Sequence, residues 1–186
     1  MPTFKEFVKV VMAEVAQALE AVDEERVSEL VQSILNAERV VVHGAGRVGL
    51  ACKGFAMRLG HLGKQAFTVA DSTVPPLGKK DLLILASSSG ETQTVYDVGV
   101  LAKSNSVRVI LITAEAQSKM ANHADAVLVL KAQTKYGPGK DVRSVQPMAT
   151  QFEQSLQILF DVTILLLMQA TQQSQADMWA RHTNLD

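Results

Sequence analysis

The chain has 186 residues, of which 47% are hydrophobic and 20% charged, a composition typical of one soluble globular domain and incompatible with disorder. Eighteen basic residues against nineteen acidic ones, without any block of like charge, predict no nucleic-acid partner and no membrane partner. The one cysteine, Cys52, cannot form an internal disulfide, the N-terminus carries no signal peptide, and the most apolar stretch, 158–168, is too short to span a bilayer. We therefore expect a cytoplasmic protein.

Residues 1–36 are predicted to form a helical arm. Apolar side chains recur at helical spacing from Phe4 to Val15, and again from Val27 to Leu35. Asp23 is the expected N-cap of the second helix. Because both helices are amphipathic, their apolar faces must pack against the body of the protein or against another subunit.

Residues 37–170 are predicted to form an α/β core, and a polar tail follows at 171–186, so that 1–186 is a single domain. The predicted strands are the short apolar runs at 39–43, 65–70, 81–86, 107–113 and 126–130, and the predicted helices begin near Gly49 and cover 92–103, 118–123 and 147–169. Strands that alternate with helices at this spacing indicate right-handed βαβ units. We expect a three-layer α/β sandwich with a five-stranded parallel sheet, flavodoxin-like or Rossmann-like. The segment 131–145 is irregular and has the length of a functional or mobile loop.

A glycine-rich motif, Gly44-Ala-Gly-Arg-Val-Gly49, follows the first predicted strand and opens a helix. It matches the dinucleotide-binding pattern G-x-G-x-x-G, and Asp71 supplies an acidic residue at the end of the second strand. The same spacing arises wherever a backbone turns tightly and approaches an anion. A nicotinamide site, a phosphosugar or other anion site, and turn geometry alone are therefore all possible, and the anion site is favoured.

A second motif, Ser87-Ser-Ser-Gly-Glu-Thr92, lies between the buried third strand and the next helix. Hydroxyl groups and a helix N-terminus at the carboxyl end of a parallel strand form a cradle for an anion. The motif lacks the Gly-Lys-Ser/Thr of a nucleotide-triphosphate loop. A helix cap is the alternative interpretation, but a cap needs only one hydroxyl, so phosphate binding is favoured.

A third motif opens the last predicted helix, where Met148, Phe152 and Leu156 are expected to face the core. Glu153 stands beside that apolar face. A partly desolvated carboxylate is a better proton acceptor, which makes Glu153 a candidate base. A lone glutamate is otherwise more often solvated or paired with a cation.

Five motifs together carry a resemblance to a known family: Gly44-Ala-Gly-Arg47, Ala56-Met-Arg-Leu-Gly-His61, Ser87-Ser-Ser-Gly-Glu-Thr92, Gln146-Pro-Met148 and Phe152-Glu-Gln154. With them the chain resembles the 6-phospho-3-hexuloisomerases of the sugar isomerase (SIS) domain superfamily, from about residue 35 to the C-terminus. The resemblance implies a homotetramer, no metal or organic cofactor, and conversion of 3-hexulose 6-phosphate to fructose 6-phosphate. It also implies that the serine-rich loop holds the phosphate and that Glu153 is the base.

Three positions depart from the pattern of that family. Val48 stands where the family usually has a serine, and Ser88 stands where it has the first glycine of Ser-Gly-Ser-Gly-Glu-Thr. Residues 149–151 replace a small Gly-Ser pair. All of them line or flank the expected pocket, so they leave the reaction type intact and the exact sugar phosphate open.

Moving a carbonyl from C3 to C2 requires a base that takes the C2 proton and returns a proton to C3, and we assign that role to Glu153. His61 or His182 is the candidate for handling the oxygen protons or opening the sugar ring, although a lone histidine is more often structural. Arg47 is expected to bind phosphate or substrate hydroxyls, or to bridge to a carboxylate. The candidate binding residues are Gly46, Arg47, Val48, Ser87, Ser88, Ser89, Gly90, Glu91 and Thr92, and no metal ligand is predicted.

Two other functions stay open from the sequence. A non-catalytic phosphosugar-sensing SIS module would keep the serine-rich loop and have no use for Glu153. A Rossmann dehydrogenase fragment would need a catalytic domain for which no residues remain. The tail is expected to dock into a neighbour's cleft, because Trp179 and His182 gain little by trailing in water.

Overall fold

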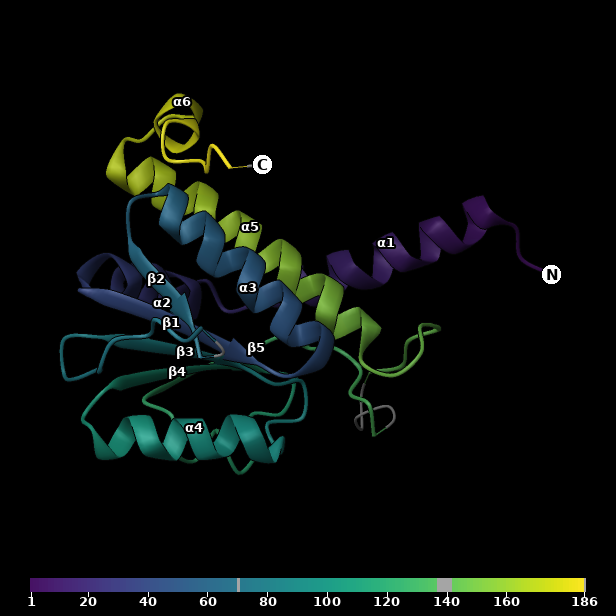
Figure 1. Ribbon diagram of the computed structural model, residues 1–186. Helices are drawn as coiled ribbons and strands as arrows, with labels where there is room; N and C mark the ends of the chain where they lie inside the picture. The colour runs from purple at the N-terminus through teal and green to yellow at the C-terminus, as the bar shows by residue number, and fades with distance from the viewer. Residues whose placement is uncertain (70, 137–141, 186) are drawn as a thin grey trace.

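The computed structural model describes residues 1–69, 71–136 and 142–185. Three predictions therefore lie partly outside the described residues: the end of the second strand at Ala70, the loop centre at 137–139, and the C-terminal Asp186. The described residues form a five-stranded sheet between layers of helices (Figure 1), which confirms the α/β fold expected from the sequence.

All five strands are parallel, in the order β2-β1-β3-β4-β5. Their bounds are β1 Arg39–Gly44, β2 Gln65–Thr68, β3 Leu82–Ala86, β4 Arg108–Thr113 and β5 Ala126–Val129. Every residue of β3 is buried, as the continuous apolar run of a central parallel strand predicts. Because β2 and β3 lie on opposite sides of β1, the sheet reverses its direction of growth there. Open α/β sheets bind ligands at the carboxyl ends of the strands at such a point.

Helices cover both faces of the sheet. Their bounds are α1 Phe4–Glu20, α2 Glu24–Asn36, α3 Gly46–His61, α4 Gln93–Ser104, α5 Thr150–Thr171 and α6 Gln175–Trp179. α3 and α5 lie over one face and α4 over the other (Figure 1). Phe55 of α3 stacks on Phe160 of α5 with ring centroids 4.1 Å apart. α5 is long and apolar enough to cross a membrane by length and composition alone, but Phe152, Leu156 and Phe160 are fully buried in the core.

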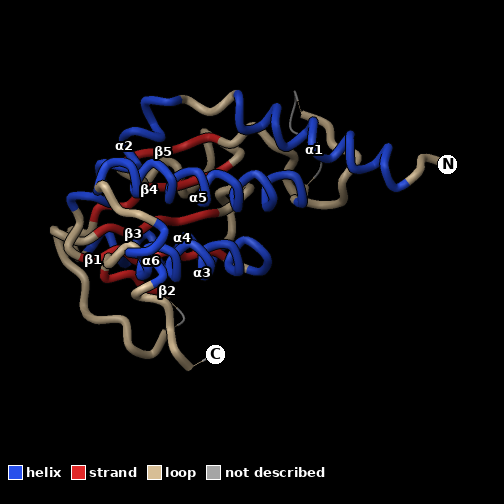
Figure 2. The backbone as a smooth tube through the Cα atoms, turned by 90° about the horizontal axis from the view of Figure 1, so that it is seen from above, coloured by secondary structure: helices blue, strands red, loops and turns tan. Residues whose placement is uncertain are grey.

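The helical arm packs on the body only in part. Asp23 caps α2, and its carboxylate accepts a hydrogen bond from the Glu25 N–H at 2.9 Å. The second half of α1 packs on α5, whereas its first half projects away from the domain (Figure 2). The apolar face of α1 is therefore buried in its second half and exposed in its first half: Val15 is 4% exposed and Phe4 81% exposed. The outer half of the arm thus leaves its apolar side chains in solvent.

The predicted helix at 118–123 is wrong, because this segment forms turns. The Asn122 N–H donates to the Ser118 carbonyl at 3.2 Å and the His123 N–H to the Met120 carbonyl at 3.0 Å. A segment this short does not sustain a helix by itself. Met120 is instead fully buried against Gly99 of α4.

One expectation near the C-terminus also changes. Met148 does not share the inward face of Phe152 and Leu156, because it precedes α5 in a left-handed conformation (φ 57°) and is 69% exposed. The tail forms the short helix α6 and folds back on the end of α3 in its own protomer. There Arg181 donates a hydrogen bond to the His61 carbonyl at 3.0 Å.

Candidate active site

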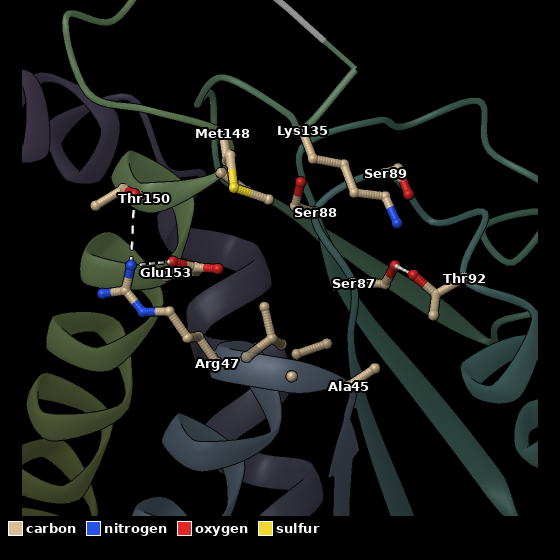
Figure 3. Close-up of a pocket in the computed structure, with 14 residues that line it drawn as sticks. Ala45, Arg47, Ser87, Ser88, Ser89, Thr92, Lys135, Met148, Thr150 and Glu153 are labelled. Atoms are coloured by element: carbon tan, nitrogen blue, oxygen red, sulfur yellow. Dashed lines mark hydrogen bonds and ion pairs between the residues drawn. The ribbon is translucent and has the colours of Figure 1, made fainter.

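A cavity of about 340 Å³ opens at the carboxyl ends of β1 and β3, where the sheet reverses its order (Figure 3). Its walls come from segments far apart in the sequence: the start of α3, the serine-rich loop after β3, and the segment that leads into α5. The lining residues are Ala45, Gly46, Arg47, Val48, Ala86, Ser87, Ser88, Ser89, Thr92, Lys135, Met148, Ala149, Thr150 and Glu153.

The serine-rich loop presents its hydroxyl groups to this cavity. Thr92 is the N-cap residue of α4, but its side chain makes no capping bond and lies 3.1 Å from the Ser87 hydroxyl. The buried Ser88 hydroxyl has no hydrogen-bond partner among the described residues. Because the hydroxyls are not used to cap α4, the loop and the positive end of the helix dipole form a surface suited to an anion.

Gly90 and Glu91 support this loop and do not line the cavity. Gly90 has φ +63°, and a Cβ atom there would overlap the Ser118 side chain. Its N–H donates to the Ser87 hydroxyl at 3.1 Å. The Glu91 carboxylate accepts a hydrogen bond from the Lys119 N–H at 2.6 Å. Both residues, expected to bind substrate, therefore hold the loop in shape in this structure.

The glycine-rich motif brings four of its residues to the cavity wall: Ala45, Gly46, Arg47 and Val48. Val48 is 8% exposed and also belongs to the apolar core, so it contributes to both. A Cβ atom on Gly49 would come within 2.6 Å of the Gly44 carbonyl oxygen. The close approach of strand and helix thus accounts for this glycine without any nucleotide.

Asp71 does not extend a nucleotide site. Its carboxylate accepts a hydrogen bond from the Thr68 N–H at 2.8 Å, and its own N–H donates to the Thr68 carbonyl at 2.9 Å. The side chain therefore closes the turn after β2. This local role disfavours the nicotinamide interpretation, which needs the carboxylate on a ribose hydroxyl.

Arg47 and Glu153 form an ion pair between α3 and α5, with Nη1 and Oε2 2.9 Å apart. Arg47 also donates to the Thr150 hydroxyl at 3.4 Å. Of the partners expected for Arg47, the structure shows the carboxylate. The Glu153 side chain is 18% exposed and that of Arg47 59% exposed, so the carboxylate lies inside and the guanidinium at the rim. The ion pair holds one oxygen of the Glu153 carboxylate and thereby orients the whole group.

Lys135 is the lining residue that the sequence did not single out. It follows β5 in the irregular segment, and its ammonium group points toward the serine-rich loop (Figure 3). A lysine in a loop has no periodicity or motif to mark it. The only sequence signal was the unusual length of the segment around it.

The structure does not bring His61 and His182 to this cavity within one protomer. His61 ends α3 while Arg47 begins it, which separates them by roughly 21 Å along the helix axis. The two imidazole rings lie 5.1 Å apart, and His182 stacks on Trp179 at 5.0 Å. Burial, the charge of Arg58 and the neighbouring His182 lower the pKa of His61, which favours a neutral ring at neutral pH.

The described residues contain no group of three or more His, Cys, Asp or Glu side chains that could hold a metal ion. The cavity chemistry on view consists of hydroxyl groups, two cations and one carboxylate. Such a set can bind a phosphorylated, hydroxyl-rich molecule and move a proton on it.

Comparison with known proteins agrees with this arrangement. The SIS domain family matches residues 33–156. A 3-hexulose-6-phosphate isomerase from Bacillus subtilis (strain 168) is 33% identical over 181 residues, covering 97% of this chain and 98% of that protein. A protein of the same name from Mycobacterium gastri is 36% identical over 173 residues, covering 93% and 86%.

A solved structure from Methanococcus jannaschii, described as inferring a molecular function of 3-hexulose-6-phosphate isomerase, has a TM-score of 0.83 and 31% identity. It covers 97% of this chain and 99% of that one. The domain match, the two near-full-length relatives and this shared fold all point to one group. The chain belongs to the SIS domain family, among the 3-hexulose-6-phosphate isomerases.

Proposed function

We propose that the protein converts 3-hexulose 6-phosphate to fructose 6-phosphate through an enediol, with Glu153 as the base. The observation that supports this most directly is the layout of the cavity. The hydroxyl groups of Ser87 and Thr92 lie on one side and the Glu153 carboxylate on the other (Figure 3). A sugar phosphate bound by its phosphate at the first wall would present its carbon chain to the second.

The phosphate end is assigned to the serine-rich loop and Lys135. A phosphomonoester is close to a dianion at neutral pH, so hydroxyl groups and a helix N-terminus benefit from a cation beside them. Arg47 is engaged by Glu153 at 2.9 Å, which leaves Lys135 as the cation that faces the loop (Figure 3). Lys135 therefore supplies the charge for phosphate in this proposal.

The reaction end is assigned to Glu153 and Arg47. The carboxylate takes the proton from C2, the C–H electrons form the C2–C3 double bond, and the C3 carbonyl oxygen becomes an enediolate. The C2 hydroxyl then loses its proton and the C3 oxygen gains one, a transfer for which His61 or His182 of a neighbouring copy is the candidate. The same carboxylic acid returns its proton to C3 as the C2 oxygen becomes the carbonyl. Arg47 lies beside the carboxylate, where a cation stabilises the negative oxygen. This sequence needs neither a metal nor an organic cofactor.

A thermal-shift experiment tests the binding part. Fructose 6-phosphate in excess should raise the Tm, and NAD or NADP should not, because a ligand stabilises only a state that binds it. Replacing Ser87, Ser89 and Thr92 by Ala should abolish the shift. Ser104→Ala, at the opposite end of α4, is the matched control and should leave the shift intact. A dinucleotide shift that survives the triple replacement would instead support the Rossmann alternative.

We also propose that 1–186 is one SIS domain, cytoplasmic, and assembled as a homotetramer. Large apolar side chains stay exposed on α1, α3 and α5, as at an interface: Phe4, Phe7, Met12, Leu50, Met57 and Leu165. The His61–His182 pair lies far from the cavity of its own protomer. In an assembly, the His61–His182 pair of a second copy completes the site in this proposal.

This shared site predicts complementation between inactive subunits. Deletion after Gln175 should leave a folded protein with severely reduced activity. Glu153→Gln and His182→Asn subunits should each be inactive, whereas hybrids of the two should regain activity, because one kind of site then holds both native residues. Activity of differently tagged, co-purified hybrids measures this. Hybrids no more active than the sum of the parents, or a monomer in light scattering, would exclude the shared site.

A further inference from the structure

Glu14, on the helical arm, is bound to residues 144–146, which lead into the cavity wall that begins at Met148. Its carboxylate accepts hydrogen bonds from the Ser144 hydroxyl at 2.6 Å, the Val145 N–H at 2.8 Å and the Gln146 side-chain amide at 3.0 Å. About 130 residues separate the partners along the chain. Hydrogen bonds to an ionised group are short and strong. Three of them therefore hold the Glu14 carboxylate and residues 144–146 in place relative to each other.

A second set of hydrogen bonds joins the same places. The Gln151 side-chain amide donates to the Glu14 carbonyl at 3.0 Å and accepts from the Gln133 N–H at 3.1 Å. The Gln133 side chain in turn donates to the Met148 carbonyl at 3.2 Å and accepts from the Ser144 N–H at 3.0 Å. Gln151 is 3% exposed. The arm, the segment after β5 and the entry to α5 thus form one polar network.

This network holds a strained turn that leads directly to the reactive end of the cavity. Met148 has φ +57°, a conformation that a residue with a side chain keeps only where its surroundings impose it. Thr150 and Ala149 follow, and Thr150 accepts the hydrogen bond from Arg47. The Glu153 N–H then donates to the Ala149 carbonyl at 3.0 Å. A displacement of residues 144–148 would therefore move the Arg47–Glu153 pair.

We propose that Glu14 is a positioning residue of the isomerase site, which fixes residues 144–150 and through them the placement of Glu153. The inference rests on the proposed function for its catalytic readout. It gives the arm a role in the chemistry of its own protomer, in addition to any contact between subunits.

The local electrostatics agree with a permanently charged anchor. Desolvation raises the pKa of Glu14, but the hydrogen bonds from Ser144, Gln146 and Val145 together outweigh it, and the pKa lies below its ordinary value. The carboxylate is therefore ionised at neutral pH, with acceptor capacity for all three donors. An alanine here would leave those donors unpaired, whereas glutamine keeps one oxygen acceptor.

Kinetics of three variants test the role. Glu14→Ala should lower kcat at least about tenfold while the KM for the sugar phosphate stays within about twofold, because misplacing a reacting group reduces rate more than binding. Glu14→Gln should recover part of the loss, because it keeps one of the two acceptor oxygens. Glu29→Ala is the matched control, because it removes the 2.7 Å contact between α2 and Arg108 of β4, remote from the cavity. It should leave kcat and KM unchanged.

A spin label tests the anchor without using activity. Cys52 is buried and its pKa is raised to about 12, so it does not compete for a thiol reagent at neutral pH. Val145 is 63% exposed, and Val145→Cys offers a site for the label on the anchored segment. Adding Glu14→Ala should sharpen the spectrum of the label, and adding Glu29→Ala should not.

The two readouts separate the possible failures. If the wild-type protein does not isomerise the sugar phosphate, the proposed function fails, and the label alone decides whether Glu14 anchors the segment. If the label mobility is the same with and without Glu14→Ala, the anchor is refuted. If the label becomes mobile while kcat is unchanged, or if Glu29→Ala lowers kcat as much, Glu14 only stabilises the arm and the positioning role is refuted.

Discussion

Glu153→Gln should lower kcat at least about a hundredfold, equivalent to about 2.7 kcal/mol of transition-state stabilisation. Glutamine has the size and shape of glutamate and can still accept a hydrogen bond from Arg47, but it cannot take the C2 proton. Binding of fructose 6-phosphate should persist, because the serine-rich loop is unchanged. Solvent-deuterium incorporation into the sugar, followed by NMR, should fall in parallel, since it reports enediol formation directly.

Asp161→Asn is the control for that experiment. Asp161 lies on the same helix and contacts Gln157 at 3.3 Å, outside the cavity lining. The Asp161→Asn variant loses one negative charge, as Glu153→Gln does, but leaves the cavity lining unchanged. Its turnover should therefore equal that of the wild type. A Glu153→Gln variant with near wild-type turnover would show that Glu153 only pairs with Arg47, and another residue would have to be the base.

Gly90→Ala should remove sugar-phosphate binding and destabilise the fold. The left-handed conformation alone costs roughly 1–2 kcal/mol for a residue with a Cβ, and the new methyl would overlap the Ser118 side chain. The loop has to shift, which moves the Ser87 hydroxyl that Gly90 contacts at 3.1 Å. Thermal denaturation with and without fructose 6-phosphate measures both effects.

Two further variants separate strain from overlap. Gly90→Ala combined with Ser118→Gly removes the overlap and keeps the strained φ, so binding should return in part and stability should stay below wild type. Gly60→Ala places a methyl where no neighbouring atom lies within 4 Å, inside α3, and should stabilise the protein slightly. Equal stability of Gly90→Ala and wild type would mean that the loop is not held as described.

The sequence by itself determined the framework and most of the cavity wall. Continuous apolar runs such as β3 can be buried only in the middle of a parallel sheet, so the strands were recognised within a residue or two. The serine-rich loop at 87–92 could be predicted as the anion-binding wall of the cavity. Its hydroxyl residues and its place between a strand and a helix are enough to indicate an anion site. The family resemblance, carried by five short motifs, supplied the reaction.

Only the tertiary structure decided which side chains meet. Arg47 and Glu153 pair across 106 positions of the chain (153 − 47), and Glu14 reaches Ser144 across 130. No periodicity within a segment encodes such contacts, because they depend on how the helices pack. Lys135 was missed for the same reason, since its loop lies beside the serine-rich loop only after β5 has joined the sheet.

His61 and Met148 show that spacing along the sequence does not determine where a side chain lies. His61 and the glycine-rich motif are close in the sequence, but an α-helix rises about 1.5 Å per residue and carries His61 to the far end of α3. Met148 has helical spacing with Phe152, yet it lies before the first turn of α5 in a left-handed conformation that distant hydrogen bonds impose. Local pattern determines what a segment can form, and the packing of remote segments determines where its side chains end.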